Sequence, residues 1–103
     1  MHLIQLFLPL YDPEGRPFPP ETRTRVREEL AERFGGVTAY GRAPAQGLWK
    51  PEEDERPVKD DLVVVEVMAE TLDRNWWSAY RAELERRFAQ DAVLIRAHPV
   101  DLL

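Results

Sequence analysis

The chain has 103 residues, of which 44% are hydrophobic and 32% charged, and a chain of this length buries one modest core. Its formal net charge is -5, and no run of lysines and arginines is free of acids. The attraction to phosphate that drives binding to nucleic acids and anionic membranes is therefore missing. Cysteine is absent, which excludes disulfides, thiol nucleophiles and thiolate metal ligands. We expect one domain over residues 1–103 that binds neither nucleic acid nor membrane.

The longest apolar run, residues 3–10, is too short to span a bilayer. It has no basic stretch before it and no small-residue cleavage site after it, as a secretion signal would. We therefore expect a cytoplasmic protein.

The first half of the chain predicts a strand, a helix and a short strand. In residues 3–10, side chains alternate between two largely apolar faces, as in a β-strand. Residues 11–20 hold four prolines and a glycine, so we expect a loop that leads into a helix near Pro20. The helix covers residues 21–34, with an apolar stripe at helical spacing formed by Val26, Leu30, Ala31 and Phe34.

Gly35 and Gly36 follow this helix and should end it, because glycine accepts the left-handed conformation of a C-terminal cap. On its polar side, Glu29 is four residues from both Arg25 and Arg33, the spacing of ion pairs on a helix. Residues 37–40 then predict a short strand. Residues 47–50 either continue that strand beyond a kink or form a separate arm, and the charged, proline-containing residues 50–60 predict a mobile connection.

The second half repeats this order with stronger signals. Residues 61–68 form a valine-rich strand that is interrupted by one charge, Glu66. Thr71 or Asp73 can cap a helix that runs to about Gln90, with a wide apolar stripe formed by Trp76, Trp77, Tyr80, Leu84 and Phe88. Residues 92–98 predict the last strand, which Pro99 should end.

The resulting order is β-α-β-β-α-β, which predicts an α+β protein with a four-stranded antiparallel sheet. The first and third strands are then central, and both helices lie on one face. This layout resembles the ferredoxin-like fold over nearly the whole chain.

The two faces of the predicted sheet differ in polarity. The face toward the helices is fully apolar and is formed by Ile4, Leu6, Leu8, Val63, Val65, Val67, Val93, Ile95 and Ala97. The face left open by the helices is still too apolar to stay in water, with Leu3, Gln5, Phe7, Leu62, Val64, Glu66, Met68, Leu94, Arg96 and His98. In dimeric α+β barrel proteins, which this layout resembles, such faces are covered by a second subunit. The resemblance implies a homodimer.

Four polar residues on that open face are candidate ligand contacts: Gln5, Glu66, Arg96 and His98. Glu66 and Arg96 either form a structural cross-strand ion pair or orient His98 as a proton acceptor in a covered cleft. A metal site formed by His98, Glu66 and the distant His2 lacks the usual ligand spacing, so no metal is predicted.

Two aromatic residues complete the candidate site. Trp49 lies in a glycine- and proline-marked segment outside any helical stripe, and Tyr40 precedes it closely. Such a ring either walls a ligand pocket or fills the end of the core or a dimer contact.

Residues 33–50 are similar to the hallmark stretch of a family of small uncharacterised bacterial proteins, a resemblance that implies a shared fold and lends no activity. The sequence matches no motif of the dimeric α+β barrel enzymes, so no catalytic residue is assigned. Phosphate-binding glycine loops, serine nucleophile elbows and dinucleotide fingerprints are also missing, and we expect no cofactor.

Three functions fit these patterns. The first is a dimeric protein that binds a small molecule or a partner at the open sheet face. The second is a cofactor-independent enzyme that uses His98 or Glu66 as a base. The third is a structural association module.

Overall fold

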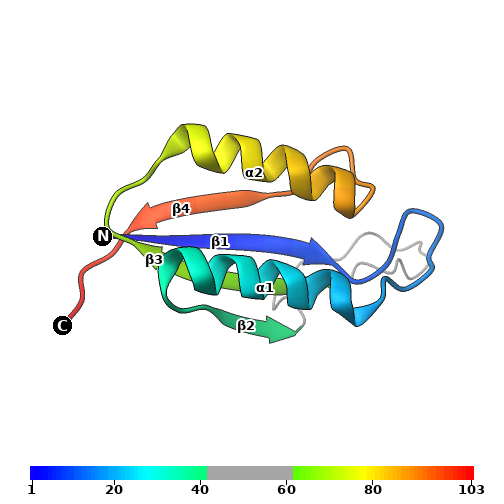
Figure 1. Ribbon diagram of the computed structural model, residues 1–103, viewed down its shortest axis with the longest axis horizontal. Coiled ribbons are helices and arrows are strands. Elements are labelled where there is room, and N and C mark those ends of the chain that lie inside the picture. The colour runs from blue at the N-terminus through cyan, green and yellow to red at the C-terminus, as the bar shows by residue number, and fades with distance from the viewer. Residues whose placement is uncertain (42–61) are drawn as a thin grey trace, which may run out of the picture.

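The computed structural model describes residues 1–41 and 62–103. Its elements in chain order are β1 (His2–Pro9), α1 (Pro20–Phe34), β2 (Thr38–Gly41), β3 (Leu62–Ala69), α2 (Arg74–Arg87) and β4 (Ile95–Pro99), as Figure 1 shows. The predicted β-α-β-β-α-β order and the α+β class are confirmed. The predictions for residues 47–50 and 50–60, the edge arm and the mobile connection, lie outside the described residues.

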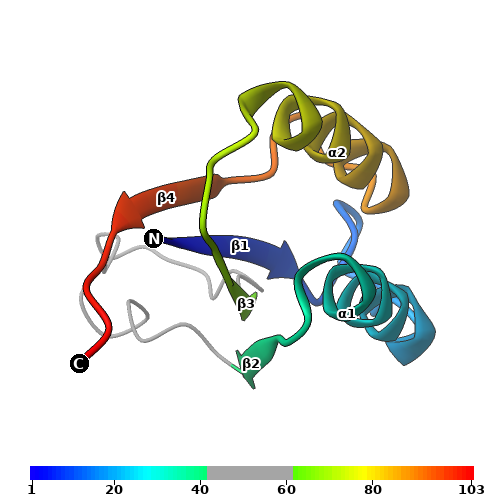
Figure 2. The same ribbon diagram turned by 60° about the vertical axis from the view of Figure 1, so that its left-hand side comes forward.

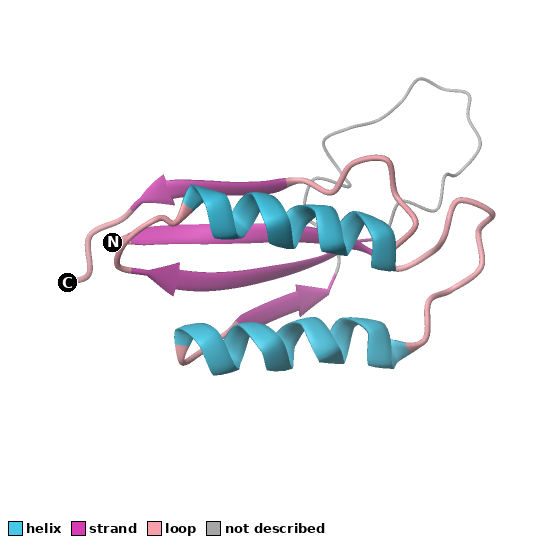
Figure 3. Cartoon of the chain, turned by 45° about the horizontal axis from the view of Figure 1, so that its top comes forward, coloured by secondary structure: helices cyan, strands magenta, loops and turns pink. Residues whose placement is uncertain are grey.

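The four strands form one antiparallel sheet in the order β2-β3-β1-β4, so the first and third strands are central as predicted. Both helices lie on the same side of this sheet (Figures 2 and 3). The ferredoxin-like prediction is therefore confirmed. We call the sheet face opposite α1 and α2 the far face.

The core lies between the sheet and the two helices. It contains the alternate residues of β1 and β3 that the sequence places on the helix side, together with the helix stripes. Leu6, Leu30 and Leu84 are fully buried and join the sheet to α1 and α2. Ala97 differs from its prediction, because it is exposed at the edge of the sheet and does not join this core.

The predicted C-terminal cap of α1 and the predicted N-terminal cap of α2 are both present. Gly35 has the left-handed φ of 88°, and its N–H donates to the carbonyl of Ala31 at 2.8 Å. At the start of α2, the side chain of Asp73 accepts a hydrogen bond from the N–H of Trp76 at 3.1 Å, which identifies Asp73 as the cap. The helix ends at Arg87, before the predicted Gln90, and Ala89 beyond it has a φ of 52°.

The last strand differs from its prediction at both ends. It begins at Ile95, because the N–H of Val93 donates to the Glu85 carboxylate at 3.2 Å and its side chain is buried in the core. Pro99 does not end the pairing, since it lies opposite His2, and the N–H of Val100 donates to the carbonyl of Met1 at 3.0 Å. A proline is tolerated there because β4 is an edge strand, where one side of the backbone needs no partner.

Side chains of α1 and α2 join the two helices directly. Glu29 accepts hydrogen bonds from the Tyr80 hydroxyl at 2.8 Å and from both terminal nitrogens of Arg87 at 2.9 Å. Arg33, which has the spacing to pair with Glu29, instead places its guanidinium over the ring of Trp76, 4.2 Å from the ring centre. Neither helix, nor any other helix in the described part of the chain, is long and apolar enough to cross a membrane.

Candidate functional site

A row of polar residues crosses the far face at mid-sheet. The strand register aligns Thr38 of β2 with Glu66 of β3, Glu66 with Gln5 of β1, and Gln5 with Arg96 of β4. Because residues opposite one another in a sheet point to the same side, all four side chains belong to the far face. The row therefore joins three of the predicted site residues across three neighbouring strands.

Gln5 connects the two charged residues of the row. Its amide nitrogen donates to Glu66 Oε2 at 2.7 Å, and its amide oxygen accepts from Arg96 Nε at 2.8 Å. A flipped amide would place a donor against the guanidinium and an acceptor against the carboxylate, so this network fixes the orientation of the amide. Gln5 and Glu66 are half-buried, which strengthens such bonds relative to those in open water.

Arg96 is held in place by two different contacts. Besides the bond from its Nε to Gln5, its guanidinium lies over the ring of Phe7, 5.0 Å from the ring centre. Its two terminal nitrogens make no hydrogen bond to any residue within the described ranges. An exposed, oriented guanidinium with these donors left over is suited to a carboxylate, a phosphate or a carbonyl group.

Apolar residues lie on both sides of the polar row. On one side the register aligns the apolar residues Met68 and Leu3 with His98, and on the other it aligns Val64 with Phe7. Met68 is 42% exposed, whereas Val64 is only 3% exposed. Leu94, whose carbonyl accepts a hydrogen bond from the N–H of Phe7, is 56% exposed and extends the apolar surface beyond β4. The predicted apolar character of this face is thus present in the structure.

The structure brings Gln5, Glu66 and Arg96 together, but not in the way expected. The sequence predicts a direct pair between Glu66 and Arg96, whereas β1 separates their strands and the Gln5 amide bridges the two side chains. His98 lies on the same face, opposite Leu3, and is exposed. Its ring has no hydrogen bond or ion pair to the described residues, so the predicted orientation of His98 by the pair is not seen.

The two aromatic candidates have different outcomes. The backbone of Tyr40 lies opposite Val64, one row from the polar row. Trp49 lies outside the described residues. Thr38 is a neighbour of Glu66 that the sequence does not predict, because the pattern of a four-residue strand does not reveal its register.

The far face offers two separated polar functions. The backbones of Glu66 and Arg96 lie two strand spacings apart, about 10 Å, and the Gln5 amide spans the gap between their charged groups. A carboxylate and a guanidinium separated by one amide, with apolar side chains on either side, suit a ligand that has polar groups at two ends and an apolar body. Within the described residues, no three histidine, aspartate or glutamate side chains gather as a metal site would require.

Comparison with known proteins identifies one distant structural likeness. The fold is similar to that of a phage SAM lyase solved in complex with S-methyl-5'-thioadenosine, with a TM-score of 0.57 and 15% sequence identity. The match covers 94% of this chain and 79% of the lyase chain, and at this identity it shows a common fold. No family model and no curated protein match the sequence, so the resemblance of residues 33–50 to a bacterial family stays a prediction.

Proposed function

We propose that this protein binds a small, partly apolar molecule at the far face of its sheet. The observation that carries this proposal is the hydrogen-bonded row Arg96–Gln5–Glu66, which crosses an otherwise apolar surface. The ligand would offer an acceptor group to Arg96, a donor group to Glu66 and an apolar body to Leu3 and Met68. Gln5 would keep the charged groups in place before the ligand arrives, which lowers the ordering cost of binding.

The proposed working form is a cytoplasmic homodimer in which a second copy covers the far face. Support comes from the exposed apolar members of this face, Met68 and Leu94, which lose contact with water when a second subunit packs there. A ligand held between two such faces is shielded from solvent on both sides. His98 remains a candidate ligand contact on this face, and Tyr40 and Trp49 remain candidates from the sequence.

The test is a thermal-shift screen against small metabolites, S-methyl-5'-thioadenosine included, followed by calorimetry on each hit. We expect Arg96→Gln and Gln5→Leu to weaken binding about tenfold or more, the effect of losing a charge-assisted hydrogen bond. Arg86→Gln is the matched control, since Arg86 lies on α2 and pairs with Glu83. If a hit binds Arg96→Gln and Gln5→Leu as tightly as it binds Arg86→Gln, the polar row is not its binding site.

The alternative is a cofactor-independent enzyme that uses Glu66 or His98 as its base. Two observations favour this alternative: the Glu66 carboxylate is oriented by Gln5, and the structural neighbour is an enzyme with a bound small molecule. Any hit from the screen should then be converted by the native protein. Glu66→Gln or His98→Ala should abolish turnover while the hit still binds, because each removes a proton acceptor and leaves the rest of the face intact. Binding without turnover in the native protein supports the first proposal.

A further inference from the structure

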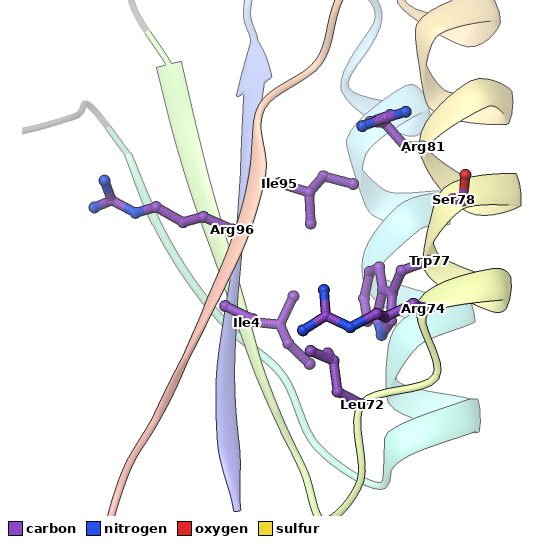
Figure 4. A pocket seen from close by; sticks show the side chains of 9 residues that line it. Ile4, Leu72, Arg74, Trp77, Ser78, Arg81, Ile95 and Arg96 are labelled. Atoms are coloured by element: carbon purple, nitrogen blue, oxygen red, sulfur yellow. The ribbon is translucent and has the colours of Figure 1, made fainter.

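A half-open groove lies on the helix side of the sheet, between α2 and the β1–β4 edge (Figure 4). Its volume is about 260 Å³, and its lining residues are Ile4, Leu72, Arg74, Trp77, Ser78, Arg81, Ile95, Arg96 and Ala97. The side chain of Arg96 points away from this groove (Figure 4) and belongs to the far face. The groove is thus separated from the polar row by the sheet itself.

The base of the groove is apolar. Ile4 is 1% exposed and Trp77 is 7% exposed, and Ile95 packs partly buried against the same core. Among the lining residues from β4, the exposed Ala97 has the smallest side chain, and this leaves space in the groove beside Ile95. An apolar group placed here would exchange water for contact with Ile4, Ile95 and Trp77.

The outer wall of the groove carries polar donors from a single stripe of α2. Arg74, Ser78 and Arg81 follow one another at helical spacing and all line the groove. Arg74 has no hydrogen bond or ion pair to a residue of the described ranges. Among the described residues, Arg81 pairs only with Glu85, at 3.6 Å, and such partly exposed surface pairs contribute little.

The charge of this wall contrasts with the rest of the molecule. The whole chain has a formal net charge of -5, whereas the charged lining of the groove is formed by arginines. The nearby Asp73 carboxylate accepts a hydrogen bond from the N–H of Trp76, as the cap of α2. Two arginine side chains above an apolar floor are electrostatically complementary to an anion with an apolar tail.

We propose that this groove is a second binding site, for a short amphipathic carboxylate. The tail lies on Ile4, Ile95 and Trp77, and the carboxylate accepts hydrogen bonds from Arg74 and Arg81. The two helix positions are about 10 Å apart, a separation that two long arginine side chains can close around one carboxylate.

The experiment titrates the full chain with octanoate and follows its backbone amides by NMR. We expect saturable shifts at Leu72, Ser78 and Ile95, which line the groove, with octanol binding about tenfold more weakly because it lacks the charge. The double variant Arg74→Gln, Arg81→Gln should weaken octanoate binding about tenfold or more and leave octanol binding unchanged. Arg86→Gln, on the same helix outside the groove, should bind octanoate like the native protein.

Ala97→Phe provides a steric test of the same site. Because Ala97 is exposed, the larger ring should fill the groove without entering the core, and both octanoate and octanol should be excluded. If Ala97→Phe does not fold, the double variant Arg74→Gln, Arg81→Gln still tests the site. Equal affinity for octanoate and octanol, an unaffected double variant, shifts confined to the far face, or no saturable shift would each overturn the proposal.

Discussion

At the scale of single residues, Glu29 determines how the two helices are held together. Burial of its carboxyl raises its pKa, but the hydrogen bonds from Arg87 and Tyr80 outweigh burial and hold the pKa below its usual value of 4.5. Burial, and then the hydrogen bond to Glu29, raise the pKa of Tyr80. The Arg87 side chain is only 13% exposed and also donates to Glu83 at 2.8 Å. A partly buried network thus joins residues 51 and 58 positions apart in the sequence.

Replacing Glu29 by glutamine should lower the free energy of unfolding by about 1–2 kcal/mol, because Arg87 and Tyr80 lose a charged acceptor. The loss is modest for a charged network because about a third of the Glu29 side chain is exposed, where solvent screens its charge. Urea denaturation measures the loss. Glu28→Gln is the control, since Glu28 lies on the exposed side of the same helix. Equal stability of the two variants would contradict the assigned role of Glu29.

The same carboxyl group makes stability depend on pH. The pKa of the Glu29 carboxyl is lower in the folded than in the unfolded chain. Its contribution to the free energy of unfolding is therefore complete above pH 4.5 and is lost as the pH falls through the pKa of the folded state. Below pH 4.5 the native protein should therefore lose stability more steeply than Glu29→Gln. Denaturation curves at several acidic pH values measure this difference, and parallel slopes for the two proteins would contradict it.

At the scale of the elements, the end of α1 depends on a glycine that other residues replace poorly. Gly35 has a φ of 88°, a conformation in which a side chain clashes with its own backbone, although a methyl group at this position would meet no other atom within 4 Å. Gly36 has equally open surroundings but no positive φ. The two neighbouring glycines therefore separate backbone strain from steric contact.

Gly35→Ala should destabilise the fold by about 1 kcal/mol, the cost of the left-handed conformation for a residue with a side chain. Gly36→Ala should be neutral or slightly stabilising, because it reduces the freedom of the unfolded chain at a compatible site. Thermal unfolding of both variants measures the contrast. If Gly36→Ala were the more destabilising of the two, the assignment of the cap to Gly35 would be wrong.

At the scale of the whole molecule, the far face governs the proposed dimer. Met68 and Leu94 are both substantially exposed on this face, so a charge there costs little in an isolated subunit. In a dimer joined by this face, the same charge would be buried without a partner and would be strongly unfavourable. Val64 would be a poor site for this test, because at 3% exposure a charge there would disturb the subunit itself.

We expect Met68→Glu and Leu94→Glu to shift the protein from dimer to monomer in sedimentation velocity, with the helical circular dichroism unchanged. Ala82→Glu introduces the same charge at an exposed position of α2 and should leave the dimer intact. A native protein that sediments as a monomer, or a dimer that tolerates both substitutions on the far face, would refute the covering of this face by a second copy.

The sequence alone determined the order of the elements, the sides of β1, β3 and β4 that face the helices, and the ends of α1. It could do so because alternation along a strand, helical spacing and the glycine cap are local properties of the chain. It also identified Gln5, Glu66 and Arg96 as polar residues of one face.

Only the tertiary structure decided how these residues meet. Their contacts depend on which strand lies between which others and on pairing between positions as far apart as Gln5 and Arg96, neither of which a local pattern contains. For this reason Glu66 and Arg96 share a glutamine bridge in place of a direct pair, and Arg33 and Glu29 find partners on α2. The start of β4 also depended on distant groups, since the side chain of Val93 is buried in the core and its N–H donates to the Glu85 carboxylate of α2.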